Sequence, residues 1–375
     1  MLDSLKALSI LLGTIIGAGI FGIPYIIEKS GVIPGFFYFL ILGGAVLLIH
    51  LLFGEAFLRT KEKMRLPGLS QKYLGSWGKD FVMISVVVGT VGALLAYLIL
   101  GGEFLKILFS SFDVSQTQLT LVFGLFLSYL IFRGIKVIAS LELLTNIFFF
   151  SAIFLILFFC LPKIEMSNIS IFNSSSAFLP FGVILFSLIG WSAIPEMADF
   201  LKLCRKPQCL KRAIVLATVI VVPFYLIFAV TVIGVAGSNT NSDALSSLLP
   251  FLGQKIMVFG ILAALITLAD SYLVLGLHLR NTFIYDLKIP KNLANLITCI
   301  SPLILFLIGF RSFIEILGFV GTVVGVIEGI VIILIFKKAK KRGDQKPAYS
   351  LKVPSLLLYF LIAVLLLGAL SQFLI

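Results

Sequence analysis

The chain has 375 residues, of which 60% are apolar and only 12% are charged, and its mean hydropathy is +1.16. This composition excludes a soluble enzyme, a disordered chain and a small disulfide scaffold. At roughly 20 residues for each helical crossing of a bilayer, it predicts an all-α integral membrane protein with about eleven transmembrane helices. The cysteines, at positions 160, 204, 209 and 299, form neither a CxxC pair nor a zinc pattern, so we expect small apolar fillers or reduced thiols.

Apolar runs between clusters of charge mark the spans in chain order. They are expected near 5–27, 33–58, 81–109, 118–132, 137–161, 178–200, 213–237, 253–279, 292–309, 313–336 and 353–374. The first run continues past Pro24 and lacks the features of a cleavable signal, so we expect it to remain as a span.

The net charge of +12 reflects where the basic residues fall. If the N-terminus is cytoplasmic, the cytoplasmic segments hold all 29 Lys and Arg except Lys29, Lys106, Lys163, Lys255 and Arg311. The positive-inside rule therefore predicts a cytoplasmic N-terminus and an outside C-terminus in the plasma (inner) membrane. The basic excess fits contact with anionic lipids in the bilayer and needs no nucleic-acid partner.

Two spans are interrupted at related places. The first contains GIFGIP at 19–24 and the sixth contains GWSAIP at 190–195, which share the pattern Gly-x-x-(Gly/Ala)-Ile-Pro. Five spans precede residue 171 and five more reach residue 336, and halves with an odd number of spans run oppositely through the membrane. We therefore predict one transport domain with a 5+5 inverted repeat, discontinuous helices 1 and 6, and one extra C-terminal helix. The repeats are 5–161 and 178–336, and the extra helix is 353–374; the alternative is that Gly and Pro are simply frequent in membrane helices.

The breaks themselves indicate a kind of ligand. Backbone groups freed within hydrocarbon must be satisfied by protein, water or a ligand. A half-helix N-terminus offers N–H groups and a positive dipole end to a carboxylate, and a half-helix C-terminus offers carbonyls to a cation. A zwitterionic amino acid carries both charges, so the break chemistry favours it.

Several motifs resemble a known family. GTIIGAGIFGIP at 13–24 resembles the first-helix signature of the aromatic/hydroxy amino acid permeases and the wider amino acid/auxin permease group. These belong to the amino acid–polyamine–organocation superfamily. GEAFLRT at 54–60, FSLIGWSAIPE at 186–196 and DSYLVLG at 270–276 agree with the resemblance, which runs in order from about residue 5 to 290. It implies a leucine-transporter-type fold and alternating-access uptake of amino acids coupled to Na⁺ or H⁺, without a cofactor.

The substrate is expected between the two breaks. Its carboxylate is placed near the amides of Ala18 and Gly19, where backbone and ligand should meet closely. Tyr97 resembles the position whose hydroxyl bonds the carboxylate, and a structural hydrogen bond between helices is equally compatible. We expect a neutral amino acid, apolar or aromatic. No Lys or Arg falls at the breaks, so backbone dipoles must recognise its carboxylate. The further candidate substrate residues, for which ordinary packing is the alternative, are Thr14, Ile15, Phe186, Ser187, Gly190 and Trp191.

A coupling-ion site is expected on the eighth span. Thr267, Asp270 and Ser271 lie at i, i+3 and i+4, so their oxygens share one helix face. The resemblance implies that carbonyls of the unwound first helix, placed here at Gly13 and Ile16, complete the site. The alternative is a neutral, hydrogen-bonded Asp270 that packs helices, but ionisable groups inside membranes are costly and are functional by default. We expect Na⁺ rather than H⁺, because a carboxylate among hydroxyls and carbonyls makes an oxygen cage.

Other ionisable groups receive weaker expectations. Glu196 follows Pro195 and is expected to complement a half-helix N-terminus, the alternative being a proton site. His50 and His278 have no second ligand at helical metal spacing, so we expect packing or interface roles. No role is assigned to Glu55, Glu103, Glu142, Glu315 or Glu328.

The sequence lacks the motifs that competing functions would require. No GxxxxGK[ST] of a primary pump occurs, and no HExxH or GxSxG of an enzyme. A channel would show a polar pore stripe or filter loop. A channel or a lipid-handling or structural membrane protein remains the alternative to an ion-coupled amino acid symporter. The sequence leaves the oligomeric state open.

Overall fold

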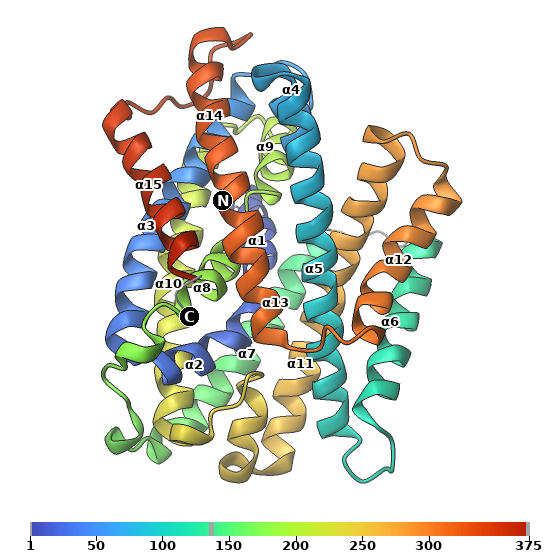
Figure 1. The fold of residues 1–375 in the computed structure, drawn as a ribbon, viewed down its shortest axis with the longest axis vertical. Coiled ribbons are helices and arrows are strands. Elements are labelled where there is room, and N and C mark those ends of the chain that lie inside the picture. The colour runs from blue at the N-terminus through green and yellow to red at the C-terminus, as the bar shows by residue number, and fades with distance from the viewer. Residues whose placement is uncertain (1, 135–138, 373–375) are drawn as a thin grey trace.

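The computed structural model describes residues 2–134 and 139–372 of the chain, and within them every regular element is helical. Figure 1 shows the long helices running side by side, with the short α4 lying across one end of the bundle. The α-helices are α1 (Leu2–Ile15), α2 (Gly19–Ser30), α3 (Val32–Leu58), α4 (Leu66–Leu74), α5 (Ser76–Leu108), α6 (Gln116–Arg133), α7 (Ala139–Cys160), α8 (Pro180–Leu188), α9 (Ala193–Leu203), α10 (Cys209–Ala236), α11 (Leu245–Asn281), α12 (Lys291–Leu307), α13 (Phe313–Phe319), α14 (Val326–Arg342) and α15 (Ser355–Ser371).

Shorter turns join these helices. Single 3₁₀ turns occupy η1 (Leu161–Lys163), η2 (Met166–Asn168), η3 (Ser174–Ser176) and η4 (Gly237–Asn239). Two π-helical segments, η5 (Thr282–Asp286) and η6 (Val320–Gly325), extend or join longer helices. The second makes α13, η6 and α14 one run of 30 residues from Phe313 to Arg342.

The prediction of an all-α polytopic membrane protein is confirmed. Seven of the described helices are long and apolar enough to cross a membrane, and the count rises to eight if the bent pair α1–α2 is one span. The predicted spans 118–132, 292–309 and 353–374 coincide with α6, α12 and α15, of 18, 17 and 17 residues. They are shorter or less apolar than the others, so the total of eleven remains a prediction. Two predicted span ends, at 137 and 374, lie outside the described residues.

The packing of the four half-helices positions the site. α1 packs against α9, and α2 packs against α8, so the two interrupted segments lie side by side in opposite directions. Beyond the first break, Phe21 of α2 packs edge to face against Phe104, Phe149 and Phe228 at centroid distances of 5.1, 6.2 and 6.4 Å. These rings from α5, α7 and α10 fill the core on that side of the break.

The loop between α14 and α15, residues 343–354, forms a strap against the end of α3. The Glu55 carboxylate, fully buried, accepts the Leu351 amide at 2.5 Å and pairs with Arg59 at 2.7 Å. Tyr349 donates its hydroxyl to the Leu51 carbonyl at 2.7 Å. At the exposed edge of the strap, the hydrogen-bonded Lys72 ammonium holds the pKa of Asp344 below its ordinary value. Glu55 is therefore a structural anchor for the last helix.

Candidate functional site

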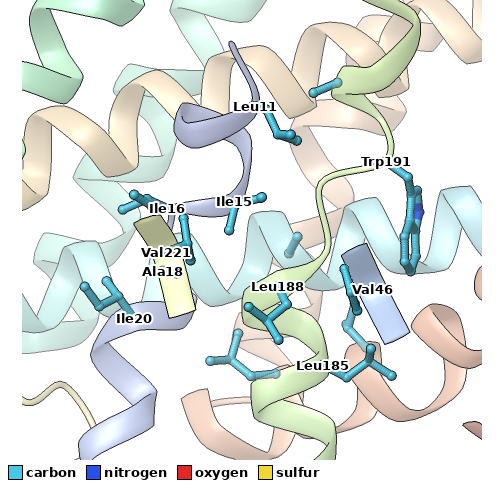
Figure 2. Packing of buried hydrophobic residues seen from close by; sticks show 14 of the residues in the cluster. Leu11, Ile15, Ile16, Ala18, Ile20, Val46, Leu185, Leu188, Trp191 and Val221 are labelled. Carbon is cyan, nitrogen blue, oxygen red and sulfur yellow. The ribbon is translucent and has the colours of Figure 1, made fainter. Parts of the chain in front are cut away.

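The two breaks meet at the centre of the site. α1 ends at Ile15 and α2 begins at Gly19, with a bend of 53° between them. α8 ends at Leu188, and α9 begins at Ala193. Figure 2 shows Ile15 and Ala18 of the first break beside Leu188, from which the second break runs without helical turns to Trp191.

The first break is held by two tyrosines. Tyr225 of α10 donates its hydroxyl to the freed Ile15 carbonyl at 2.9 Å. The hydroxyl of Tyr97, a buried residue of α5, lies near the Ala18 backbone and the Ser271 side chain. A Cβ on Gly17 would overlap that hydroxyl, so glycine here lets α5 approach the break. Tyr97 thus links the first break to α11.

The second break is held by α3 and α14. The Gly190 amide donates to Nε2 of His50 at 3.1 Å, which satisfies a buried backbone group that the break would otherwise leave unpaired. The Trp191 indole donates to the Glu328 carboxylate at 2.5 Å, and Ser85 of α5 donates to its other oxygen at 3.5 Å. The packing role expected for His50 is therefore a specific one, because its imidazole supports the break.

A cavity opens beside both breaks. The space between its lining atoms, including the part open to the outside of the protein, is about 970 Å³. α5 and the run Phe313–Arg342 supply apolar wall residues, namely Val86, Gly89, Ala93, Val320 and Val324. The predicted substrate residues in the lining are Thr14, Ile15, Gly19, Tyr97, Phe186 and Trp191.

Three predicted substrate residues lie behind this lining. Ala18 contacts Tyr97 through its backbone, and Gly190 is bonded to His50. The hydroxyl of Ser187 donates to the Val183 carbonyl at 2.7 Å. A Cβ on Gly19 would overlap Ser187, so the close approach that requires glycine there is between α2 and α8. Helix packing therefore gives a second reason for this glycine, and its close approach to a ligand stays a prediction.

Charged residues surround the mouth of the cavity. Its lining reaches Arg65, which forms an ion pair with Glu196 at the start of α9. A second pair joins Lys63 to Asp199 at 3.8 Å. The Glu196 side chain is 51% exposed, as suits a residue that complements a half-helix N-terminus; its role as a proton site remains a prediction.

Two of the candidate ion-binding residues form hydrogen bonds with different neighbours. Thr267 donates to the Ala263 carbonyl within its own helix at 3.0 Å, and Asp270 accepts from Thr145 of α7 at 3.4 Å. The next residue, Asn146, donates to the Ser9 carbonyl at 3.0 Å, and a Cβ on Gly13 would lie 3.2 Å from its amide nitrogen. This face of α11 is thus connected to the first break through α5 and α7. A cation held jointly by the Gly13 and Ile16 carbonyls remains a prediction.

Sequence reasoning missed part of the cavity. Glu328, His278 and Arg65 all line it, although none was assigned a role there. Glu328 follows Val320 and Val324 at intervals of four residues, so one helix face carries all three. That spacing, together with a carboxyl inside an apolar run, is the signal by which the sequence could have indicated this wall of the cavity.

A bundle of membrane-spanning helices with two interrupted helices beside a cavity defines a membrane transport protein. The chain belongs to the tryptophan/tyrosine permease family, which its residues 3–372 match. It is an amino acid permease and an integral membrane protein, not an enzyme. The resemblance to amino acid permeases is confirmed at this level, while the wider superfamily and its fold type remain predictions.

Two curated relatives are similar over most of their length. "Glutamine transporter 2" of Aliivibrio fischeri is 25% identical over 324 residues, covering 84% of this chain and 83% of the relative. "Tyrosine-specific transport system 2" of Haemophilus influenzae is 25% identical over 336 residues, covering 83% of this chain and 82% of the relative. Both names describe amino acid transporters.

Proposed function

We propose that this permease is an ion-coupled symporter of neutral amino acids with an apolar or aromatic side chain, working by alternating access. The observation that carries the proposal is the packing of two interrupted helices, in opposite directions, beside one largely apolar cavity. A transporter's central site is expected where interrupted helices occupy corresponding positions in its two halves. The 5+5 repeat, 5–161 and 178–336, and the extra helix 353–374 belong to this proposal.

The substrate carboxylate binds at the start of α2. The first N–H groups of a helix lack partners within it and carry the positive end of its dipole. Gly19 begins α2 and lines the cavity, with the Tyr97 hydroxyl beside Ala18. No Lys or Arg lies in residues 16–18 or 189–192, so these dipoles provide the positive potential. The names of the relatives and of the family refer to glutamine, tyrosine and tryptophan, all neutral overall, which supports a neutral substrate here.

The coupling ion is Na⁺, held by Thr267, Asp270 and Ser271 together with carbonyls of the first break. The Tyr97 hydroxyl lies near both the Ser271 side chain and the Ala18 backbone, so this face of α11 is close to the first break. Such proximity lets the ion and the substrate carboxylate strengthen each other's binding, and the coupling is reciprocal.

A state open to the cytoplasm also belongs to this proposal. The cavity lining reaches Arg65, Leu66 and Pro67, which the positive-inside rule assigns to the cytoplasmic side. On the other side of the break, the rings around Phe21 are packed closed. Release of substrate to the cytoplasm therefore needs no further opening of the first break.

Uptake into proteoliposomes tests this function. Saturable uptake of labelled amino acid should require a Na⁺ gradient, and replacing Na⁺ with choline at fixed pH should abolish it. Uptake that persists in choline and follows an imposed pH gradient would replace Na⁺ by H⁺ in the proposal. Passive flux without saturation would reject the symporter. Asp270→Asn should uncouple transport under either ion, so the ion replacement decides between them.

A further inference from the structure

Glu328 places a carboxyl group in an apolar part of the cavity wall. Val320, Val324 and Glu328 share one face of the run Phe313–Arg342. α5 lies against this face so closely that a Cβ on Gly89 would approach Val324 to 2.6 Å. The face begins in the π-helical segment η6, a type of irregularity that is frequent at functional sites.

The partners of Glu328 leave part of its hydrogen-bonding capacity unused. The residue is 6% exposed, yet it lines the cavity. Its carboxylate accepts from Trp191 at 2.5 Å and from Ser85 at 3.5 Å. A carboxylate has about four lone-pair positions, so acceptor sites remain. Among the described residues, no Lys, Arg or His lies within ion-pair distance of it.

The unused acceptor sites of Glu328 could be satisfied by a hydrogen-bond donor on a ligand in the cavity. Ionisable groups within the membrane are costly and mark functional sites. The Trp191 indole that Glu328 binds belongs to the second break and lines the same cavity. A ligand whose amino and carboxyl groups lie at the breaks therefore extends its side chain between Trp191 and the Val320–Val324 face, toward Glu328.

We propose that Glu328 recognises a hydrogen-bond donor on the substrate's side chain: a phenol hydroxyl, an indole N–H or a carboxamide. This inference rests on the proposed function and deepens it, because it divides neutral amino acids into two groups. A side chain with a donor satisfies the carboxylate, whereas a purely apolar one of the same shape leaves a buried acceptor unpaired. Sites built around such a bond reject the analogue that lacks it far more strongly than apolar pockets reject a missing methylene.

Competition binding with matched pairs tests the inference on the purified full-length protein. One member of each pair lacks the donor: tyrosine against phenylalanine, tryptophan against 1-methyltryptophan, and glutamine against glutamate γ-methyl ester. The last two analogues also gain a methyl group, so tyrosine against phenylalanine is the pair without added bulk. In whichever pair binds, the member with the donor should bind about ten-fold or more tightly, because the other member leaves a buried acceptor unpaired. In Glu328→Leu this ratio should fall to about one, with binding of the donor-free member retained.

Two further variants separate recognition from support of the break. Trp191→Phe keeps the aromatic wall but removes the indole donor, so the preference for the donor should persist or increase. Exposed Glu165 lies in a loop outside the cavity, and Glu165→Gln should leave every ratio unchanged. If Trp191→Phe abolishes the preference just as Glu328→Leu does, Glu328 merely positions Trp191 and the inference is overturned.

The remaining outcomes are also decisive. Equal affinity within every pair that binds would overturn recognition by Glu328, and this result requires no variant to fold. Loss of pH-gradient-driven uptake in Glu328→Gln, with equal affinities in the wild type, would make the residue a proton carrier instead. If none of these amino acids binds the wild-type protein while saturable uptake of another neutral amino acid occurs, the inference fails and the proposed function stands. If no amino acid shows saturable uptake, the proposed function fails, and the inference fails with it.

Discussion

Tyr97 and Tyr225 each bring a hydroxyl to the first break, but only Tyr97 lines the cavity. We predict that Tyr97→Phe weakens amino acid binding about ten-fold, because a hydrogen-bonding partner at the carboxylate site is lost. Tyr225→Phe is the matched control: it should lower the free energy of unfolding by about 1 kcal/mol and leave the binding constant unchanged. Isothermal titration and thermal unfolding of both variants check this, and equal effects on binding would contradict the assignment.

His50 shows how a residue far away in sequence supports a break. Its Nε2 accepts the Gly190 amide, 140 residues along the chain. His50→Leu should leave this buried N–H unpaired and cost about 1–3 kcal/mol of stability. A decrease in melting temperature, followed by fluorescence-detected size-exclusion chromatography, is the expected result. Leu40→Ile, at a side chain 60% exposed on the outer face of the same helix, should leave the melting temperature unchanged.

Six of the nine predicted substrate residues line the cavity, but the partners of Gly190 and Trp191 could not be predicted. Gly, Ala and Pro at 17–24 and 190–195 mark both breaks, because they loosen or interrupt helical hydrogen bonding locally. The pairing of Trp191 with Glu328 and of Gly190 with His50 depends on how α3 and α14 pack in space. No local pattern carries that information, so an isolated His or Glu in an apolar run gave no sign of its partner.

At the scale of elements, close contact between helices depends on particular glycines. The Cβ direction of Gly321 in η6 points into the backbone carbonyl of Gly182 in α8, whereas a Cβ on Gly318 would meet open space. Gly321→Ala should therefore destabilise the protein by about 1–3 kcal/mol or more, since a backbone atom cannot rotate away. Gly318→Ala should be neutral or slightly stabilising, because alanine is the better helix former. Melting temperatures of the two variants test this, and similar values would contradict the predicted packing of α8 on η6.

The presence of a helix could be predicted from the sequence far better than the residues at which it begins and ends. The apolar runs located α3, α5 and α10, because a span of hydrocarbon must be apolar throughout. α5 begins at Ser76, before the run expected from residue 81, and α11 begins at Leu245, ahead of a kink at Gly253 with φ of 75°. These extensions are polar or irregular turns outside the apolar run, so hydropathy does not register them.

At the scale of the whole molecule, the proposed orientation can be tested with the chain's own thiols. Cys204 and Cys209 lie half-buried in the basic turn between α9 and α10, while Cys160 and Cys299 are buried. We predict that a membrane-impermeant maleimide labels the protein in inverted membrane vesicles and not in intact cells. The double variant Cys204→Ser with Cys209→Ser should abolish the labelling. Modification in intact cells that this double variant removes would reverse the topology.

The contact between α3 and the strap can form only late in synthesis. Glu55 emerges early from the ribosome, but its partner Leu351 follows 296 residues later. At translation rates of roughly 5–20 residues per second, this interval is about 15–60 s. Until then the end of α3 holds a carboxylate whose only close partner in the same helix is Arg59. The first quarter of the protein therefore reaches its final form only when synthesis is nearly complete, and a ribosome that stalls within the last thirty residues leaves an early helix unfinished.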